Sequence, residues 1–368
     1  MTIDRALATA TALSIALVLL IGGSLVITDE RSLLYDAEKR EIEKTAVVLT
    51  TAMNQAATLS AIHSELLSVD PNVIRMMTAG ARDELQVYSQ PIFDRLRGLA
   101  GIDVMHFHDA TMKSFLRVWE PANFGQDLSS FRPMVVATNH SHQTQKGLEV
   151  GIKGLSLRAV SAIMDGPRLV GTVETGVRLQ SLADLAKAAT GGDYALVLDP
   201  QLLKGAQPSA TGPSNGLVLD AATDRQLFER ILGSGVVHLS HDSYQIAFDD
   251  GNRTLGVQGK PLIDYSGNVI GTILTTCDFT ALRTYANRSL VTIIGVSLAG
   301  LMLMFAVIMV TIRVAVIRPL RASSESLEAG QPLPASAATA LSDFRRLFAA
   351  VHNAAGTRGA QKHDQSEA

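Results

Sequence analysis

Residues 114–136 read SFLRVWEPANFGQDLSSFRPMVV, and residues 147–177 read GLEVGIKGLSLRAVSAIMDGPRLVGTVETGV. Short apolar runs alternate with polar residues and end at Gly or Pro, a pattern typical of half-buried antiparallel strands. Four charged residues stand inside these runs: Arg117, Glu149, Arg158 and Glu174. Burying an ion costs several kcal/mol unless it is paired. The stretch therefore predicts either a structural ion network or a pocket that binds a polar small molecule.

Two uncharged stretches, residues 6–28 and 289–312, each exceed the roughly 20 residues that span a bilayer as a helix. The first is long for a signal peptide and no small-x-small cleavage site precedes Asp29, which favours an uncleaved membrane helix. Arginines lie just outside both stretches, and the positive-inside tendency then places residues 1–5 and the chain after residue 312 in the cytoplasm. Residues 29–288 are expected outside a plasma membrane, in a periplasm.

The composition excludes several classes of protein. The 368 residues carry 32 Lys and Arg against 35 Asp and Glu, so no excess of positive charge points to nucleic acid. Cys277 is the single cysteine, so the outer region must fold without an internal disulfide. No nucleophile elbow, phosphate-binding loop or cysteine with a base is present, and we expect neither an enzyme nor a cofactor.

Residues 30–67 contain no Gly or Pro and predict one long helix, and a second is expected over residues 71–99. In the first helix, apolar and small residues recur at alternating spacings of three and four, as in a heptad seam. The seam predicts packing along a partner helix in a homodimer, or else a stripe that covers the chain's own domain. Its members are Ile42, Thr45, Leu49, Ala52, Ala56, Leu59, His63 and Leu66.

The outer region contains an internal repeat of about 100 residues. Residues 162–173 read AIMDGPRLVGTV and residues 261–273 read PLIDYSGNVIGTI, so that Asp165 matches Asp264 and Gly171 matches Gly271. The repeat predicts two stacked modules, residues 100–189 and 190–280. We expect strands near 102–109, 114–120, 147–151, 154–165, 168–178, 194–198, 235–240, 243–248, 253–264 and 268–277, and helices near 129–139 and 179–189. Asp278 is expected to cap the exit helix.

Two such modules behind a long helix and between two membrane spans resemble the double Cache sensory domains of bacterial receptors. Residues 106–132, HFHDATMKSFLRVWEPANFGQDLSSFR, and 147–160, GLEVGIKGLSLRAV, are similar to the Cache subfamily of chemotaxis receptors and two-component sensor kinases. The resemblance implies an α+β fold of two PAS-like modules, each an antiparallel sheet with flanking helices. It also implies that the distal module, residues 100–189, holds the ligand.

Residues 313–356 resemble a HAMP linker, through IRPL at 317–320, EAG at 328–330 and SDFRRLFAAVHN at 342–353. The alternative is an amphipathic tail on the membrane surface. Residues 357–368 are expected to be a disordered tail. No kinase, cyclase or methylated coiled-coil motif follows, so either an output module has been removed or the protein signals through a cytoplasmic partner.

Arg117 is flanked by Phe115 and Trp119 on one face of its predicted strand, and a guanidinium binds a carboxylate bidentately. The hypothesis is that Arg117, Arg158 and Arg132 hold an anionic or zwitterionic metabolite. Trp119 would form a wall, and Glu149 or Glu174 would take an ammonium group. The alternative is that these arginines and glutamates only pair with one another.

Two His-x-His pairs could in principle hold one metal ion, namely His106 with His108 and His140 with His142. Without a clear third ligand we expect no metal, with His108 lining the pocket or bonding to a turn.

The sequence thus predicts a dimeric transmembrane receptor for a small ligand. The competing prediction is a membrane-tethered accessory protein whose outer domain binds another protein.

Overall fold

The computed structural model describes residues 3–151, 154–199, 201, 216–329, 346 and 350. The chain divides into two units. One comprises Met1–Leu34 and Arg283–Ala368, and the other, which we call the central unit, is Tyr35–Leu282.

Two helical stretches, Thr9–Ser68 and Thr280–Ser326, each contain a segment long and apolar enough to cross a membrane. The first belongs to α1 (Ile3–Ser68) and the second begins with α7 (Thr280–Ile312). The side chain of Asp278 accepts a hydrogen bond from the Thr280 backbone N–H at 2.9 Å, as expected for the cap of the exit helix.

A π-helical turn (Arg313–Ile317) follows α7 and leads into α8 (Arg318–Glu328). Pro319 has no N–H to donate to the carbonyl of residue 315, which explains why the helix changes here from α-helical to wider π-helical hydrogen bonding. The predicted HAMP linker, 313–356, falls largely outside the described residues, as does the tail at 357–368.

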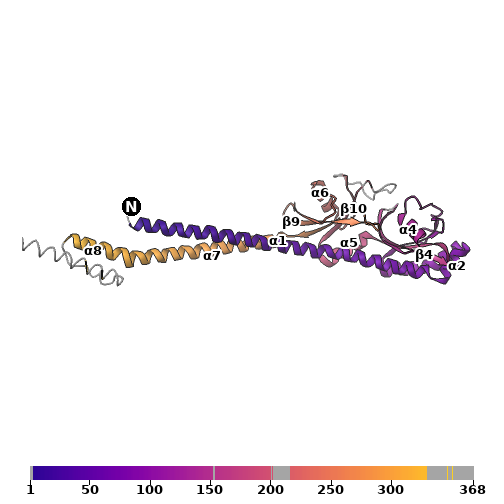
Figure 1. Ribbon diagram of the computed structural model, residues 1–368, viewed down its shortest axis with the longest axis horizontal. Helices are drawn as coiled ribbons and strands as arrows, with labels where there is room; N and C mark the ends of the chain where they lie inside the picture. Colours follow the sequence, from indigo (N-terminus) through magenta and orange to yellow (C-terminus); the bar gives the residue numbers. More distant parts are fainter. Residues whose placement is uncertain are drawn as a thin grey trace, which may run out of the picture. The chain divides into compact units, whose positions relative to one another are not determined.

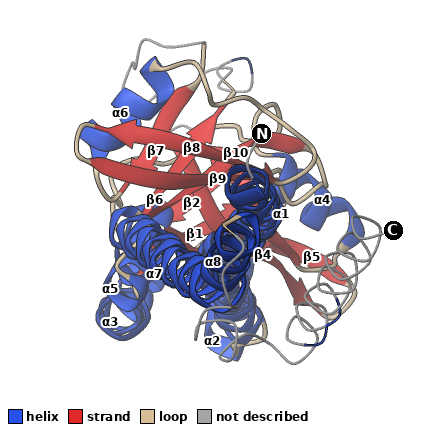
Figure 2. Ribbon diagram, turned by 90° about the vertical axis from the view of Figure 1, so that its left-hand side faces the viewer, coloured by secondary structure: helices blue, strands red, loops and turns tan. Residues whose placement is uncertain are grey.

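The central unit contains two five-stranded antiparallel sheets with the same strand order, β2-β1-β5-β4-β3 and β7-β6-β10-β9-β8. This matching order confirms the two-module α+β fold that the repeat predicted (Figures 1 and 2). The first sheet comprises β1 (Ile102–Asp109), β2 (Ser114–Arg117), β3 (Gln145–Gly151), β4 (Gly154–Asp165) and β5 (Arg168–Arg178). The second comprises β6 (Asp193–Leu198), β7 (Val218–Ala222), β8 (Tyr244–Asp250), β9 (Arg253–Ile263) and β10 (Val269–Asp278).

Short helices flank the sheets, with α4 (Pro133–Ser141) beside β3, β4 and β5 and α5 (Leu179–Thr190) leading from the first sheet to the second. The predicted helix over 71–99 is wrong in one respect. It is divided into α2 (Pro71–Ala79) and α3 (Arg82–Ala100), because Gly80 adopts a left-handed φ of 68° and ends α2.

The region between β6 and β8 also differs from the prediction. Residues 235–240 form no strand, whereas β7 and α6 (Arg225–Gly233) were not predicted. Asp224 caps α6 by accepting a hydrogen bond from Leu227 N at 3.0 Å. The buried side chains of α6 lie one helical turn apart and pack on the second sheet: Leu227, Phe228, Ile231 and Leu232.

Helix α1 runs alongside both sheets and buries half of its predicted seam within the central unit (Figure 1). Ile42, Leu49 and Ala56 are at most 9% exposed, whereas Leu59 and Leu66 are 49% and 63% exposed. Its backbone also bonds to both sheets. Thr175 of β5 donates to Ser60 O at 2.7 Å, and Tyr194 of β6 donates to Thr45 O at 2.8 Å. The first half of the seam therefore covers the chain's own domain.

The two modules share one apolar core cluster, which includes Leu155 and Val177 from the first sheet and Tyr194 and Ile270 from the second. Hydrogen bonds of backbone groups cross the same boundary. Tyr265 N donates to Leu148 O at 3.0 Å, and Leu155 N donates to the carboxylate of Asp220 at 3.3 Å. The modules are thus joined by both packing and polar contacts.

Gly171 and Gly271, matched by the repeat, occupy equivalent positions on β5 and β10. A Cβ atom at Gly171 would lie 2.2 Å from His108 O, and one at Gly271 would lie 2.0 Å from Val197 O. Each glycine thus permits a close approach of neighbouring strands that no other residue allows.

Candidate functional site

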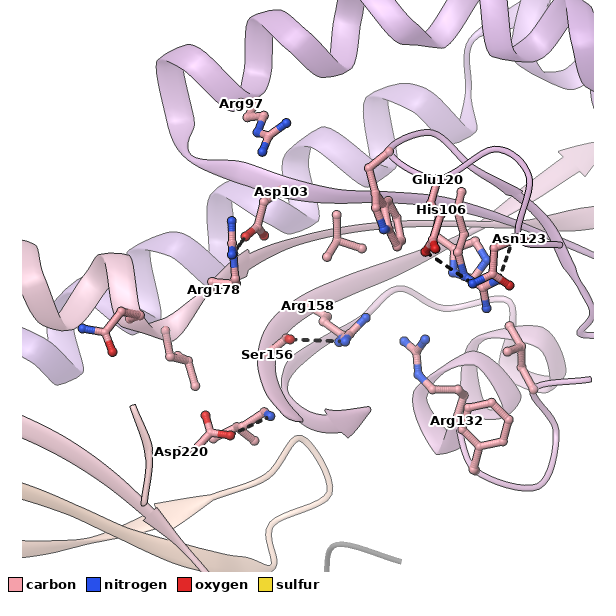
Figure 3. A pocket seen from close by; sticks show the side chains of 18 of the residues that line it. Arg97, Asp103, His106, Glu120, Asn123, Arg132, Ser156, Arg158, Arg178 and Asp220 are labelled. Atoms are coloured by element: carbon pink, nitrogen blue, oxygen red, sulfur yellow. Dashed lines mark hydrogen bonds and ion pairs between the residues drawn. The ribbon is translucent and has the colours of Figure 1, made fainter. Parts of the chain in front are cut away.

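A cavity of about 450 Å³ lies in the central unit beside the first sheet. Its wall combines apolar side chains with an unusual number of charged ones (Figure 3). Residues from both modules contribute, among them Asp103, His106, Arg117, Trp119, Glu120, Asn123, Gln126, Arg132, Leu155, Ser156, Arg158, Arg178, Asp220 and Ala221. Its volume suits a small metabolite.

An ion network is buried behind this wall and centres on Glu174 of β5, which is fully buried. Arg132 Nη2 donates to Glu174 Oε2 at 2.7 Å, and Arg158 Nη1 donates to Glu174 Oε1. Arg132 Nε also donates to Glu149 Oε2 at 2.7 Å, and Met134 N donates to Glu149 Oε1 at the same distance. Both carboxylates are therefore occupied, and neither lines the cavity. The geometry gives no support to either glutamate as a partner for a ligand's ammonium group.

The pKa values in this network follow from the pairing. Burial alone would raise the pKa of Glu174, but Arg132 and Arg158 outweigh it and hold the pKa well below its usual range. Burial likewise opposes the charge of Arg132, yet Glu174 and Glu149 raise its pKa. Glu174 and Arg132 are therefore both ionised near neutral pH.

Arg117, at the end of β2, is also buried at 7% exposed but is compensated differently. Its Nη1 donates to Asn123 O at 2.6 Å and Asn123 Oδ1 at 2.7 Å, and its Nη2 donates to Gln126 Oε1 at 2.8 Å. These partners are neutral. Burial lowers the pKa of Arg117, while the charge of Glu120 acts in the opposite direction. Arg117 thus presents a buried positive charge to the cavity.

Trp119 lies in the turn after β2 and lines the cavity, with its ring in edge contact with His106 at 5.8 Å between centroids. Phe115 does not line the cavity but packs against the core of the first module. The predicted floor of an arginine between two aromatic rings is therefore reduced to one ring, because the pairing of β1 with β2 shifts register at this point and leaves Phe115 without a paired residue.

His106 and His108 lie on one face of β1, and their rings meet at 4.1 Å. His106 Nε2 shares a hydrogen bond with Ser114 Oγ and His108 Nδ1 with Thr172 Oγ1, both at 2.8 Å. Burial lowers the pKa of both imidazoles, so they are neutral at physiological pH. His106 lines the cavity, whereas His108 is fully buried behind it.

His106, His108 and Glu174 bring three possible metal ligands within 4.8 Å of one another. His108 Nε2 and Glu174 Oε2 are 3.5 Å apart. Arg132 already occupies that carboxylate oxygen, however, and a dication would join three buried guanidinium groups. The donors fit a metal, but the surrounding charge opposes one. His140 and His142 are exposed on α4 and at its end, away from this group.

Acidification is expected to lower the melting temperature through His106. Its folded-state pKa lies below the unfolded value of about 6.5, so the unfolded chain binds the proton first. Stability is then complete above about pH 6.5 and declines below it. We expect the melting temperature to fall between about pH 7.5 and pH 5.5, and to fall less in His106→Gln, which preserves a partner for Ser114. Part of the slope remains in the variant, because His108 and His63 have lowered pKa values too. An unchanged slope in the variant contradicts the assignment.

Several wall residues were not predicted from the sequence. Asn123 and Gln126 lie in the connection after β2, within the stretch that carries the family resemblance. Asp103 pairs with Arg178 at the start of β1 and the end of β5. Asp220 and Ala221 come from β7 of the other module, and no local pattern marks them as part of a site.

Three bacterial domains are among the solved structures similar to the chain. The ligand-binding domain of the Campylobacter jejuni chemoreceptor Tlp3 in complex with 4-methylisoleucine is 12% identical, with a TM-score of 0.42, and the match covers 67% of this chain and 92% of that one. The sensor domain of the V. cholerae histidine kinase DctB is 10% identical, with a TM-score of 0.41 and coverage of 68% and 98%. The E. coli DcuS sensor domain is 17% identical, with a TM-score of 0.31 and coverage of 36% and 96%.

No curated protein sequence matches the chain. A family model does match residues 35–281, nearly the whole central unit, and is described as the double sensory domain of two-component sensor kinases. Domains of this family are ligand-binding sensors rather than catalysts. Two sheets of identical order, a cavity in the first module and this match lead to one conclusion: the chain belongs to the dCache_3 family of double sensory domains.

Proposed function

We propose that the protein is a transmembrane receptor that binds a small anionic or zwitterionic metabolite in the cavity of its distal module. Arg117, Arg158 and Arg132 supply the positive charge, Trp119 and His106 supply the wall, and Glu149 and Glu174 hold the arginines in place. His108 supports the site from behind.

The observation that carries the proposal is the charge of Arg117. Among the buried groups of the site, three guanidinium groups face two carboxylates, and both carboxylates bond to Arg132 or Arg158. Arg117 bonds to neutral amide groups and lines a cavity large enough for a metabolite. Glu120 lines the same cavity but is only half-buried, so a ligand carboxylate would supply the negative charge that the buried groups lack.

The signal would pass to the cytoplasm through the helices that flank the central unit. In this proposal residues 29–288 are periplasmic, both termini are cytoplasmic, and residues 313–356 act as a HAMP-like linker to an output module or partner. The receptor would work as a homodimer, and the exposed positions Leu59, Ile62, Leu66 and Val69 of the central unit, spaced at three and four residues, would face the partner helix. Ligand binding would bias two helix packings by its different affinity for each.

A membrane-tethered accessory protein remains the competing function. It requires no cavity, and its outer domain would present an apolar surface to another protein. A charged cavity beside Arg117 and Arg158 favours the receptor.

The test is ligand binding by the full chain in lipid nanodiscs. A thermal-shift screen with organic acids, amino acids and metal salts should yield at least one stabilising acid, whose affinity is then measured by calorimetry. Arg117→Gln should weaken that affinity by at least about tenfold, because a charge-assisted hydrogen bond is lost. This variant leaves no buried carboxylate unpaired, so the protein is expected to fold.

Arg168→Gln is the matched control, because Arg168 is 62% exposed and pairs with Asp165 on the surface. It should bind as the parent does. If no organic acid or amino acid stabilises the parent, or if Arg117→Gln binds the identified ligand as tightly as the parent, the proposed function is wrong.

A further inference from the structure

The cavity of the distal module has a carboxylate that belongs to the other module. Asp220 stands on β7 of the second sheet and lines the cavity together with its neighbour Ala221. It reaches the first residues of β4, where it accepts a hydrogen bond from Leu155 N at 3.3 Å (Figure 3). A ligand in this cavity is therefore in contact with both modules.

Asp220 is weakly compensated compared with Glu149, Glu174 and Asp103. Glu149 and Glu174 bond to buried arginines, and Asp103 pairs with Arg178. For Asp220 the described residues provide one long hydrogen bond from a neutral backbone group. Burial raises its pKa, while Leu155 N and the charge of Arg225 only partly oppose that rise. A half-buried carboxylate in this state gains from a cationic partner.

Arg158 brings a positive charge to the same strand, only three residues beyond Leu155. Its Nη2 donates to Ser156 Oγ at 3.2 Å, and Ser156 is the residue next to Leu155, while its Nη1 is held by Glu174. Figure 3 shows Arg158, Ser156 and Asp220 along one side of the cavity. This wall therefore presents the cation of Arg158 and the anion of Asp220. Leu155, which bonds to Asp220, is three residues from Arg158 on a strand that rises about 3.3 Å per residue.

We propose that Asp220 reads the ammonium group of a zwitterionic ligand, whose carboxylate lies against Arg158 and Arg117. The inference rests on the proposed function and narrows its ligand from acids in general to amino acids. Asp220 then acts as a specificity residue. A deaminated acid of the same carbon skeleton would leave its carboxylate unpaired.

The experiment compares amino acids with their deaminated counterparts on the full chain in nanodiscs, by calorimetry. The ω-amino acids glycine, β-alanine, 4-aminobutanoate and 5-aminopentanoate are paired with acetate, propanoate, butanoate and pentanoate. Alanine and leucine are paired with propanoate and 4-methylpentanoate. In the ω series the distance between the ammonium and the carboxylate increases with chain length, so the best binder indicates the separation that the site prefers. At least one amino acid should bind about tenfold or more tightly than its partner acid.

Asp220→Asn should remove that preference while changing the affinity for the deaminated acid by less than about twofold. Asparagine retains an oxygen for Leu155 N, so the contact between the modules is preserved. Asp242→Asn is the control. Asp242 is exposed on the same module, and its substitution makes the same change of charge away from the cavity. It should keep the parent's preference.

The outcomes separate the two proposals. Equal affinity for amino acids and deaminated acids, or an amino-acid preference that survives Asp220→Asn, overturns the role of Asp220 and leaves the receptor function standing. Binding of a dicarboxylate such as succinate, with no binding of any amino acid, likewise overturns the role of Asp220 and leaves the receptor function standing. Absence of binding for every acid and amino acid overturns both.

Discussion

Glu174→Gln is expected to lower the free energy of unfolding by about 3–5 kcal/mol, the usual result of removing one partner from a buried ion pair. Glu174 accepts hydrogen bonds from both Arg132 and Arg158 and has no contact with solvent. Glutamine preserves the size of the side chain but removes its charge. The buried cluster would then hold three guanidinium groups and one carboxylate.

The measurement is thermal unfolding of the full chain in nanodiscs, where a loss of this size lowers the melting temperature by roughly 6–20 °C. Glu84→Gln serves as the control, since Glu84 is 63% exposed in a surface pair with Arg75, and its change should be slight. Adding Arg158→Met to Glu174→Gln restores the charge balance and should recover part of the loss. If Glu174→Gln melts like the parent, the cluster does not stabilise the fold.

Gly271→Ala is expected to cost about 3 kcal/mol, the upper end of the usual range for overpacking. The added Cβ would lie 2.0 Å from Val197 O, and both atoms belong to paired strands of the second sheet. Relief requires β10 and β6 to separate locally, which breaks ladder hydrogen bonds. The melting temperature should fall by roughly 6–12 °C.

Gly98→Ala supplies the contrast. Gly98 lies inside α3, and an alanine Cβ at this position would have no heavy atom within 4 Å apart from its chain neighbours and the backbone of its own helix, so alanine should leave stability unchanged or raise it. Gly171→Ala, the matched change in the first module, should act with the same sign as Gly271→Ala. A neutral result for both strand glycines would show that the sheets yield easily at these positions.

The sequence predicted the parts of the fold that depend on local pattern. The repeated Asp and Gly-Thr at 165–172 and 264–272 mark equivalent hairpins, and the two sheets have the same strand order. The charges inside the strands of residues 114–178 were predicted to need compensation, and Arg132 and Arg158 do bond to buried glutamates.

The remaining features depend on contacts distant in sequence. Nothing near Arg117 distinguishes a partner such as Glu149 from one such as Gln126, because the choice follows from how the connection after β2 folds. Asp220 reaches the cavity only because β7 lies against the start of β4. The break at Gly80 illustrates a weak local signal, since a glycine inside an apolar pattern is compatible with a helix until its φ is known.

Helix α1 has a further consequence for how the central unit moves. Its carbonyl groups at Thr45 and Ser60 accept hydrogen bonds from different sheets, so one uninterrupted helix connects the two modules. A hinge motion between the modules would have to bend α1 or break one of these two hydrogen bonds. A small tilt of either sheet should therefore strain α1 and be transmitted along the helix.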